Sequence, residues 1–163
     1  MFISEERKKS PLKGVGIQYI PGHKEEFIDY LINKYLPISG NILDLGGGGF
    51  RFAIPASLKG AAITVVDKDH SSLNLMGIGK KVNKIGKLNI DLKKIKKLIT
   101  VKTDDIFHYL KETNISYDFI SAFRVIHLFS PKEIDTFFSL VSKKMNKDSL
   151  FAISAITLYD LLK

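Results

Sequence analysis

The sequence predicts an α/β fold: a mainly parallel sheet with helices packed on both faces. Short apolar segments alternate with segments of helical periodicity, and the apolar segments are nearly continuous rather than alternately polar and apolar. Strands of that kind are typical of parallel sheets, whose crossover helices cover both sides. The first apolar segment ends in four consecutive glycines, Gly46 to Gly49, which predicts a tight turn between a strand and a helix.

Five segments are expected to form the strands: residues 41–45, 61–66, 98–103, 117–122 and 149–155. Helices are expected over residues 24–36, 50–58, 72–81 and 131–145; in the first and last of these, apolar residues recur every three or four positions. The apolar face of the first helix is expected to hold Phe27, Tyr30, Leu31 and Tyr35. That of the last helix is expected to hold Ile134, Phe137, Phe138 and Val141.

The composition excludes several kinds of site. The chain has no cysteine, so disulfides, thiolate zinc sites, iron–sulfur clusters and a cysteine nucleophile are all excluded. The histidines do not have the spacing of metal ligands on one helix face, and we expect no metal site. The first residues lack the apolar stretch of a signal peptide, and no apolar run approaches the roughly 20 residues that cross a bilayer. We therefore expect one cytoplasmic domain over residues 1–163, with no membrane partner.

Candidate ligand-binding residues follow the first two expected strands. In an open parallel sheet the ligand lies beyond the carboxyl ends of the strands, where the strand order reverses. Glycines there let a ligand approach the backbone closely, and the following helix supplies unpaired N–H groups. Asp67 ends the second strand, 19 residues after Gly48, where a carboxylate can accept hydrogen bonds from ribose hydroxyls. A nucleoside-containing ligand is the first inference.

The glycine turn does not fit a dinucleotide. The fingerprint G-x-G-x-x-G would need glycine at position 51 or 52, which are Arg51 and Phe52. Asp44, just before the glycines, would repel a pyrophosphate but could pair with an ammonium group. A nicotinamide-dependent dehydrogenase is therefore the weaker hypothesis, and a cationic ligand is favoured.

At this point the sequence resembles the class I S-adenosylmethionine-dependent methyltransferases. The segment from Asp44 to Phe50 is similar to the first motif of that family, with Phe50 in place of its third glycine. Residues 63–67, 101–107 and 117–128 resemble the later motifs in the correct order. The resemblance covers residues 41–155 and implies a Rossmann-like, doubly wound sheet with strand order 3-2-1-4-5 and S-adenosylmethionine as cofactor.

The resemblance also implies a role for each matching residue in cofactor binding. Gly46, Gly47 and Gly48 would line the methionine part of the cofactor, and Asp44 would hold its ammonium group. The ribose would lie at Asp67, with Lys68 beside it.

Asp105, with Asp104 as second choice, would bind the adenine together with Ile106. Phe123 would close the site near the sulfonium, and His127 is the candidate catalytic base if the acceptor must lose a proton. The acceptor itself is expected to be a small molecule.

Plainer interpretations remain open for several of these residues. The glycines could form a turn without a ligand, Asp67 could cap the next helix, and His127 could be structural. At least one of Asp104 and Asp105 is expected to be a solvated turn residue. The lysine-rich stretch Lys80 to Lys97 could bind RNA, although no aromatic residue interleaves its lysines to stack a base, so nucleic acid is possible but not favoured.

The chain departs from the family after its fifth strand. Residues 156–163 are too few for the helix and antiparallel hairpin that usually follow in the family. Either the chain is a truncated form of the family or its sheet is reduced. In the second case we expect the fifth strand to be an open edge, covered by a second copy of the chain or by a partner. The alternative function is an inactive methyltransferase-like subunit completed by such a partner. Residues 1–40 are expected to supply a lid, over 13–21, and the first helix.

Overall fold

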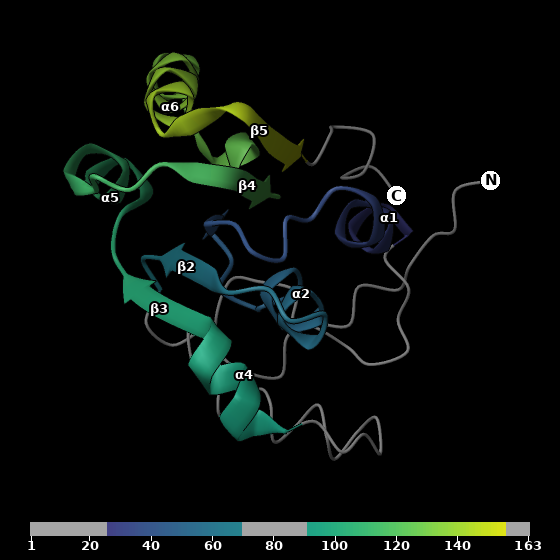
Figure 1. Cartoon of the computed structure of the whole chain (residues 1–163). Coiled ribbons are helices and arrows are strands. Elements are labelled where there is room, and N and C mark those ends of the chain that lie inside the picture. The colour runs from purple at the N-terminus through teal and green to yellow at the C-terminus, as the bar shows by residue number, and fades with distance from the viewer. Residues whose placement is uncertain (1–25, 70–90, 156–163) are drawn as a thin grey trace, which may run out of the picture.

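The computed structural model describes residues 26–69 and 91–155. Within these ranges, five parallel strands form one sheet in the order β3-β2-β1-β4-β5, which confirms the predicted topology. The strands are β1 (Ile42–Leu45), β2 (Ile63–Asp67), β3 (Ile99–Thr103), β4 (Tyr117–Phe123) and β5 (Met145–Ser154). The sheet is covered on both sides by helices, as Figure 1 shows.

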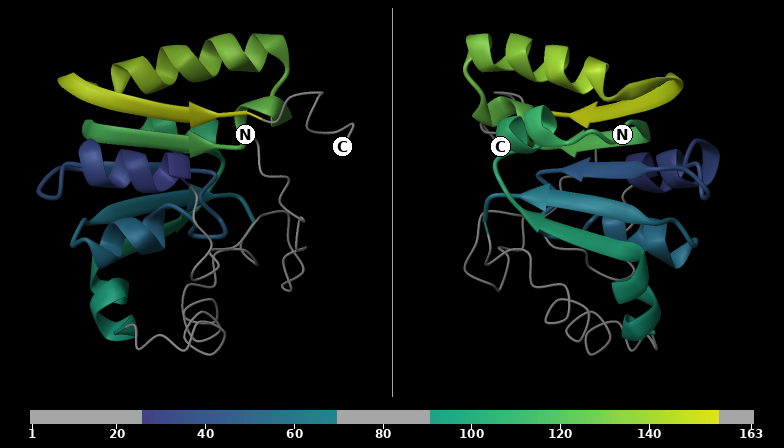
Figure 2. Two further views of the ribbon diagram at one scale, coloured as in Figure 1. Left: turned by 90° about the vertical axis from the view of Figure 1, so that its right-hand side faces the viewer. Right: turned by 60° about the vertical axis from the view of Figure 1, so that its left-hand side comes forward.

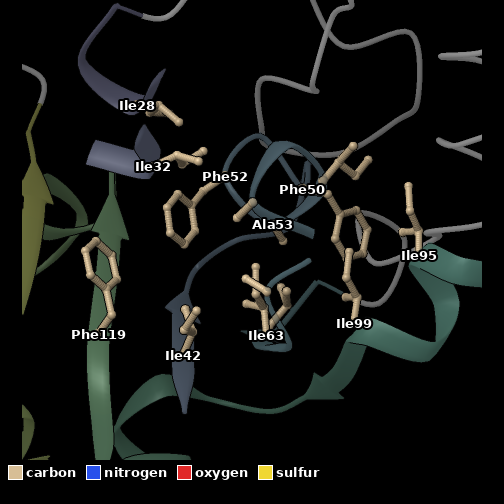
Figure 3. Packing of buried hydrophobic residues seen from close by; sticks show 14 of the residues in the cluster. Ile28, Ile32, Ile42, Phe50, Phe52, Ala53, Ile63, Ile95, Ile99 and Phe119 are labelled. Carbon is tan, nitrogen blue, oxygen red and sulfur yellow. The ribbon is translucent and has the colours of Figure 1, made fainter. Parts of the chain in front are cut away.

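The first face of the sheet packs against α1 (Glu26–Lys34), α2 (Ala53–Leu58) and α4 (Leu92–Leu98). Figure 3 shows the core of this face, to which α1 contributes Ile28 and Ile32 and α4 contributes Ile95. In the same core the ring of Phe52 lies against Phe119 of β4. The two rings are stacked with centroids 5.5 Å apart. This packing holds Phe52 and α2, which follow the glycine turn, against the sheet.

The second face packs against α5 (Ile106–Glu112) and α6 (Pro131–Lys143), which lie on the opposite side from α1 and α2 (Figure 2). Its centre is Phe137, whose ring lies 5.3 to 6.3 Å, centroid to centroid, from neighbouring phenylalanine rings. Those rings belong to Phe107, Phe129, Phe138 and Phe151. A capping box between Ser130 and Glu133 begins α6.

The structure corrects the expected face of the first helix. Among the residues of α1 whose burial is described, Ile28 and Ile32 are buried and Leu31 packs against the same core as expected, whereas Tyr30 and the following Tyr35 are exposed. The two tyrosines instead make an edge-to-face contact with each other and flank the ammonium group of Lys34. Smaller isoleucines fit the space above Phe52, while the polar ends of the tyrosines reach water.

Two helices, α4 and α5, are additions to the expected elements. Each begins at an aspartate whose side chain accepts hydrogen bonds from the backbone, Asp91 for α4 and Asp105 for α5. Each helix is only seven residues long, so its apolar pattern is short. In α4 the lysines obscure that pattern, and before α5 the residue Asp105 was interpreted as a ligand contact rather than as a helix cap. Strand β5 also begins at Met145, four residues before the expected start at residue 149.

Some expectations lie outside the described residues. These are the helix over 72–81, the lid over 13–21, residues 80–90 of the lysine-rich stretch, and residues 156–163. In the described part of the chain no helix is long and apolar enough to cross a membrane. The same part gives β5 one neighbouring strand, β4, so the expected partner on its other edge stays a prediction.

The central position of Phe137 predicts a large loss of stability when its ring is removed. Phe137→Ala should lower the free energy of unfolding by about 3–5 kcal/mol, because the cavity forms where the side chain is fully buried. Phe138→Ala is the matched control, because the adjacent ring is 42% exposed and its loss should cost far less. Urea unfolding followed by circular dichroism measures both, and equal losses would contradict this description of the core.

Candidate functional site

The expected site residues gather at the carboxyl ends of β1, β2 and β4. β1 is the point where the strand order reverses, because β2 pairs with one of its edges and β4 with the other. Asp44 lies opposite Val65 of β2 and Ser121 of β4 in the strand register. Asp67 ends β2 and Phe123 ends β4.

The glycine turn after β1 is shaped by close packing. Gly46 has φ +70°, and its N–H donates to the carbonyl of Val66 at 2.7 Å, which ties the turn to β2. A Cβ added to Gly46 would lie 2.3 Å from Val125 Cγ2, and one added to Gly47 would lie 2.2 Å from Asp44 Oδ2. Both positions therefore require glycine, and the Gly47 backbone lies directly against the Asp44 carboxyl.

Asp44 is a buried acid, and one of its two carboxyl oxygens is unsatisfied by the residues that the structure describes. It is 2% exposed, and Oδ1 accepts a hydrogen bond from Ser121 Oγ at 2.8 Å. Oδ2 has no hydrogen-bond partner among the described residues. Burial raises the pKa of Asp44 to about 7, the Ser121 hydrogen bond opposes that rise, and the charge of Asp67 adds to it. An unpartnered buried carboxylate oxygen is costly, so a donor is expected to meet it in the functional state.

Asp67 connects β2 to the glycine turn. Its Oδ2 accepts the N–H of Gly48 at 3.0 Å, and its Oδ1 accepts the N–H of Asp69 at 2.9 Å. Burial raises its pKa, while these two hydrogen bonds and the charge of Lys68 lower it. Each carboxylate oxygen has two lone pairs, so Asp67 keeps capacity to accept from ligand hydroxyls. Lys68 itself is exposed.

Asp104 and Asp105 form the turn that begins α5. The N–H of Asp104 donates to the carbonyl of Asp67 at 3.1 Å, which brings this turn next to the end of β2. Asp105 caps α5 by accepting the N–H groups of Phe107 and His108 at 2.9 and 3.1 Å. Asp104 pairs with His108 Nδ1 at 2.9 Å and raises the pKa of that imidazole. Both acids therefore have local structural roles, while Ile106 is half-buried beside them.

The chain after β4 carries the two remaining candidates. Phe123 is half-buried and makes an edge contact with Phe52, with ring centroids 5.6 Å apart. Arg124 follows with φ +58°, and its N–H donates to the carbonyl of Ser154 at 2.9 Å. His127 lies on the short 3-10 helix η1 (Ile126–Leu128), and its side chain is exposed.

Ser121 is the residue of this site that sequence reasoning missed. It is fully buried on β4 and donates to Asp44 Oδ1. The signal in the sequence was a hydroxyl in an otherwise apolar central strand, two residues before Phe123. Its meaning depends on the register between β1 and β4, which the sequence alone did not supply.

Comparisons with known proteins identify the architecture. No protein-family profile and no curated protein sequence matches the chain. The structure is similar to that of the glycopeptide N-methyltransferase MtfA, with a TM-score of 0.63, 13% identity, and coverage of 84% of this chain and 56% of MtfA. It is also similar to precorrin-6y C5,15-methyltransferase from Geobacter metallireducens GS-15, with a TM-score of 0.60, 15% identity, and coverage of 85% and 66%.

A third similar structure is a putative SAM-dependent methyltransferase from Streptococcus mutans, with a TM-score of 0.59, 20% identity, and coverage of 84% of this chain and 36% of that one. The chain has the class I methyltransferase fold. It spans about half of the length of MtfA.

Phe50 shows how this methyltransferase fold tolerates a departure from the first motif. Phe50 has φ +54°, in the left-handed region that favours the glycine expected at this place. Its side chain is fully buried and lies near Ile99 in the core that Figure 3 shows. Burial of the ring offsets the strain of a non-glycine residue in that conformation, so the turn keeps its path without the third glycine.

The raised pKa of Asp44 predicts that Asp44→Asn stabilises the ligand-free chain more at pH 8 than at pH 5. Between the ordinary value of 3.8 and the folded value of about 7, the folded chain holds a proton that the unfolded chain has released. Stability contributed by this group therefore falls as pH rises through that window. The uncharged side chain removes this loss, and the expected gain at pH 8 is on the order of 1–3 kcal/mol.

Urea unfolding at both pH values measures this effect, with Asp118→Asn as the control. Asp118 accepts hydrogen bonds from Asn41 and Asn146, which lower its pKa, so the control should lose stability at pH 8. An equal effect of Asp44→Asn at pH 5 and pH 8 would contradict the proposed burial of a titrating carboxyl.

Proposed function

We propose that the chain is an S-adenosylmethionine-dependent methyltransferase that acts on a small-molecule acceptor. The observation that carries this proposal is Asp44 Oδ2, which has no hydrogen-bond partner in the described part of the chain and is buried against the backbone of Gly47 at the point where the strand order reverses. Structures of MtfA, which has the same fold, are known in complex with S-adenosylmethionine and with S-adenosylhomocysteine. The fold and the free acid together support this cofactor.

The donors and acceptors of the site fit the parts of this cofactor. The ammonium group of the methionine part is a donor of the right charge for Asp44 Oδ2, which lies against the backbone of Gly47. Asp67 and Lys68 are proposed for the ribose, since Asp67 keeps free lone pairs while it holds the N–H of Gly48. Asp104, Asp105 and Ile106 are proposed for the adenine, because the turn is hydrogen-bonded to the end of β2.

A dinucleotide fits these residues less well. Its pyrophosphate would lie at the glycine turn, next to the buried acid Asp44 and near Asp67, whose charge already raises the pKa of Asp44. A third negative group there would be repelled in a site of low dielectric constant. The two acids therefore favour a ligand whose group at this turn is cationic.

The main task of the protein in methyl transfer is to align the acceptor with the methyl group. When bound, the sulfonium supplies an activated methyl group, so the protein's task is to hold an acceptor in line with it. Phe123 is proposed at the transferring end, and exposed His127 is proposed to take a proton from acceptors that must lose one.

A second candidate acceptor is RNA. It is favoured by the exposed lysines of α4, which are Lys93, Lys94, Lys96 and Lys97. The small-molecule proposal is preferred because none of the acids of the candidate site comes from α4. An inactive subunit completed by a partner chain would show weak cofactor binding or none by itself.

Calorimetric titration with S-adenosylhomocysteine tests the proposed function, with NADH as the control ligand. We expect micromolar binding of the first ligand, about −8 kcal/mol, and none of the second. Asp67→Ala should weaken binding at least tenfold, about 1.4 kcal/mol, because the ribose loses its acceptor and Gly48 loses its hydrogen bond.

Asp135→Ala is the matched control, because Asp135 is an exposed acid on α6 and its loss should leave the affinity unchanged. Binding of NADH alone would favour a dehydrogenase, and binding of neither ligand would favour the partner-completed subunit.

A further inference from the structure

One row of side chains crosses the sheet on the face covered by α2. It begins as an apolar row, with Ile63 of β2, Ile42 of β1 and Phe119 of β4 in register. The next row on the same face lies two residues closer to the carboxyl ends of the strands. In that row β1 contributes Asp44 and β4 contributes Ser121. A polar pair has thus replaced apolar residues where the apolar core meets the glycine turn.

The Ser121 hydroxyl is committed to Asp44. Ser121 Oγ lies 2.8 Å from Asp44 Oδ1 and 3.3 Å from the carbonyl oxygen of Leu43, and it has a single proton to donate. The shorter distance and the charge of the carboxylate favour Asp44 as the acceptor. Because Ser121 is fully buried, loss of its hydroxyl would not be compensated readily by water.

Fixing Oδ1 also determines the direction of Oδ2. Once Ser121 holds the first oxygen, the second lies against the backbone of Gly47, where an added Cβ would be 2.2 Å away. The same Cβ would lie 2.9 Å from Val65 Cγ1, so the space around Oδ2 is narrow and partly apolar. A carboxyl group free to rotate about its Cβ–Cγ bond would not keep one oxygen at this place.

We propose that Ser121 is a positioning residue for the cofactor, which acts by holding Asp44 with Oδ2 directed at the glycine turn. The inference rests on the proposed function, because the group to be received at Oδ2 is the cofactor's ammonium. Ser121 itself makes no contact with the cofactor in this proposal.

The electrostatics of Asp44 support this role. Burial and the negative charge of Asp67, on β2, both raise the pKa of Asp44, and the Ser121 hydrogen bond is the interaction that lowers it. Without the hydroxyl, both remaining influences favour the protonated acid. A protonated carboxyl at neutral pH would lose its charge attraction to an ammonium group.

The test measures the affinity for S-adenosylhomocysteine between pH 6 and pH 8.5 for the wild type, Ser121→Ala and Ser121→Cys. Both variants remove the strong donor: Ser121→Ala does so without enlarging the buried side chain, and Ser121→Cys puts a larger, weakly donating thiol in its place. We expect about tenfold weaker binding at pH 7, and the loss should shrink as pH rises and the carboxyl ionises. Ser121→Thr retains the hydroxyl and should recover most of the affinity.

Asp44→Asn provides the control background. There Ser121→Ala should have little further effect, because its proposed action passes through the carboxyl. Unchanged affinity in Ser121→Ala and Ser121→Cys would overturn the inference, as would a loss that is independent of pH and persists in the Asp44→Asn background.

A wild type that binds no S-adenosylhomocysteine contradicts the proposed function instead. In that event, carboxyl carbon NMR of the ligand-free chain decides the remaining part of the inference. An Asp44 titration that moves to higher pH in Ser121→Ala supports the action of Ser121 on Asp44, and one that does not move overturns it.

Discussion

The burial of the Asp44 carboxyl at the end of the central strand is the constraint on which the site depends. β1 lies between β2 and β4, so a side chain on it is covered from both sides and by the helices of that face. The neighbouring residues are arranged to tolerate the acid: Ser121 donates to one oxygen, and Gly47 has no Cβ that would strike the other. A substitution at either residue is therefore expected to displace the Asp44 carboxyl.

Backbone hydrogen bonds carry this constraint to the other parts of the site. Gly46 donates to Val66, Gly48 donates to Asp67, and Asp104 donates to the carbonyl of Asp67. The glycine turn, the end of β2 and the start of α5 are therefore one connected framework rather than three separate loops. Asp44 on β1, Asp67 at the end of β2 and the turn of Asp104 and Asp105 keep their relative positions because the connections after these strands are joined to each other as well as to the sheet.

The sequence was most informative where a residue's meaning is local. The five strands were predictable from continuous apolar segments, and Asp44 and Asp67 from their places beside a glycine turn and at a strand end. Ser121 was not, because its partner is 77 residues away and the pairing exists only through the register of β4 on β1. Asp105 illustrates the opposite difficulty, since one acidic residue before an apolar segment signals a helix cap and a ligand contact equally well.

The free-energy cost of burying the acid would link binding of the proposed cofactor to the stability of the chain. A chain that holds an unpaired carboxylate in its interior is less stable at neutral pH than one with a neutral residue there, because burial disfavours the charged form. A cationic group at Oδ2 would remove that penalty, so part of the cofactor's affinity would come from relief of a strain already present in the free protein. Selection for fold stability alone would favour a neutral residue at position 44. The acid at this position is therefore better explained by a ligand than by the sheet that surrounds it.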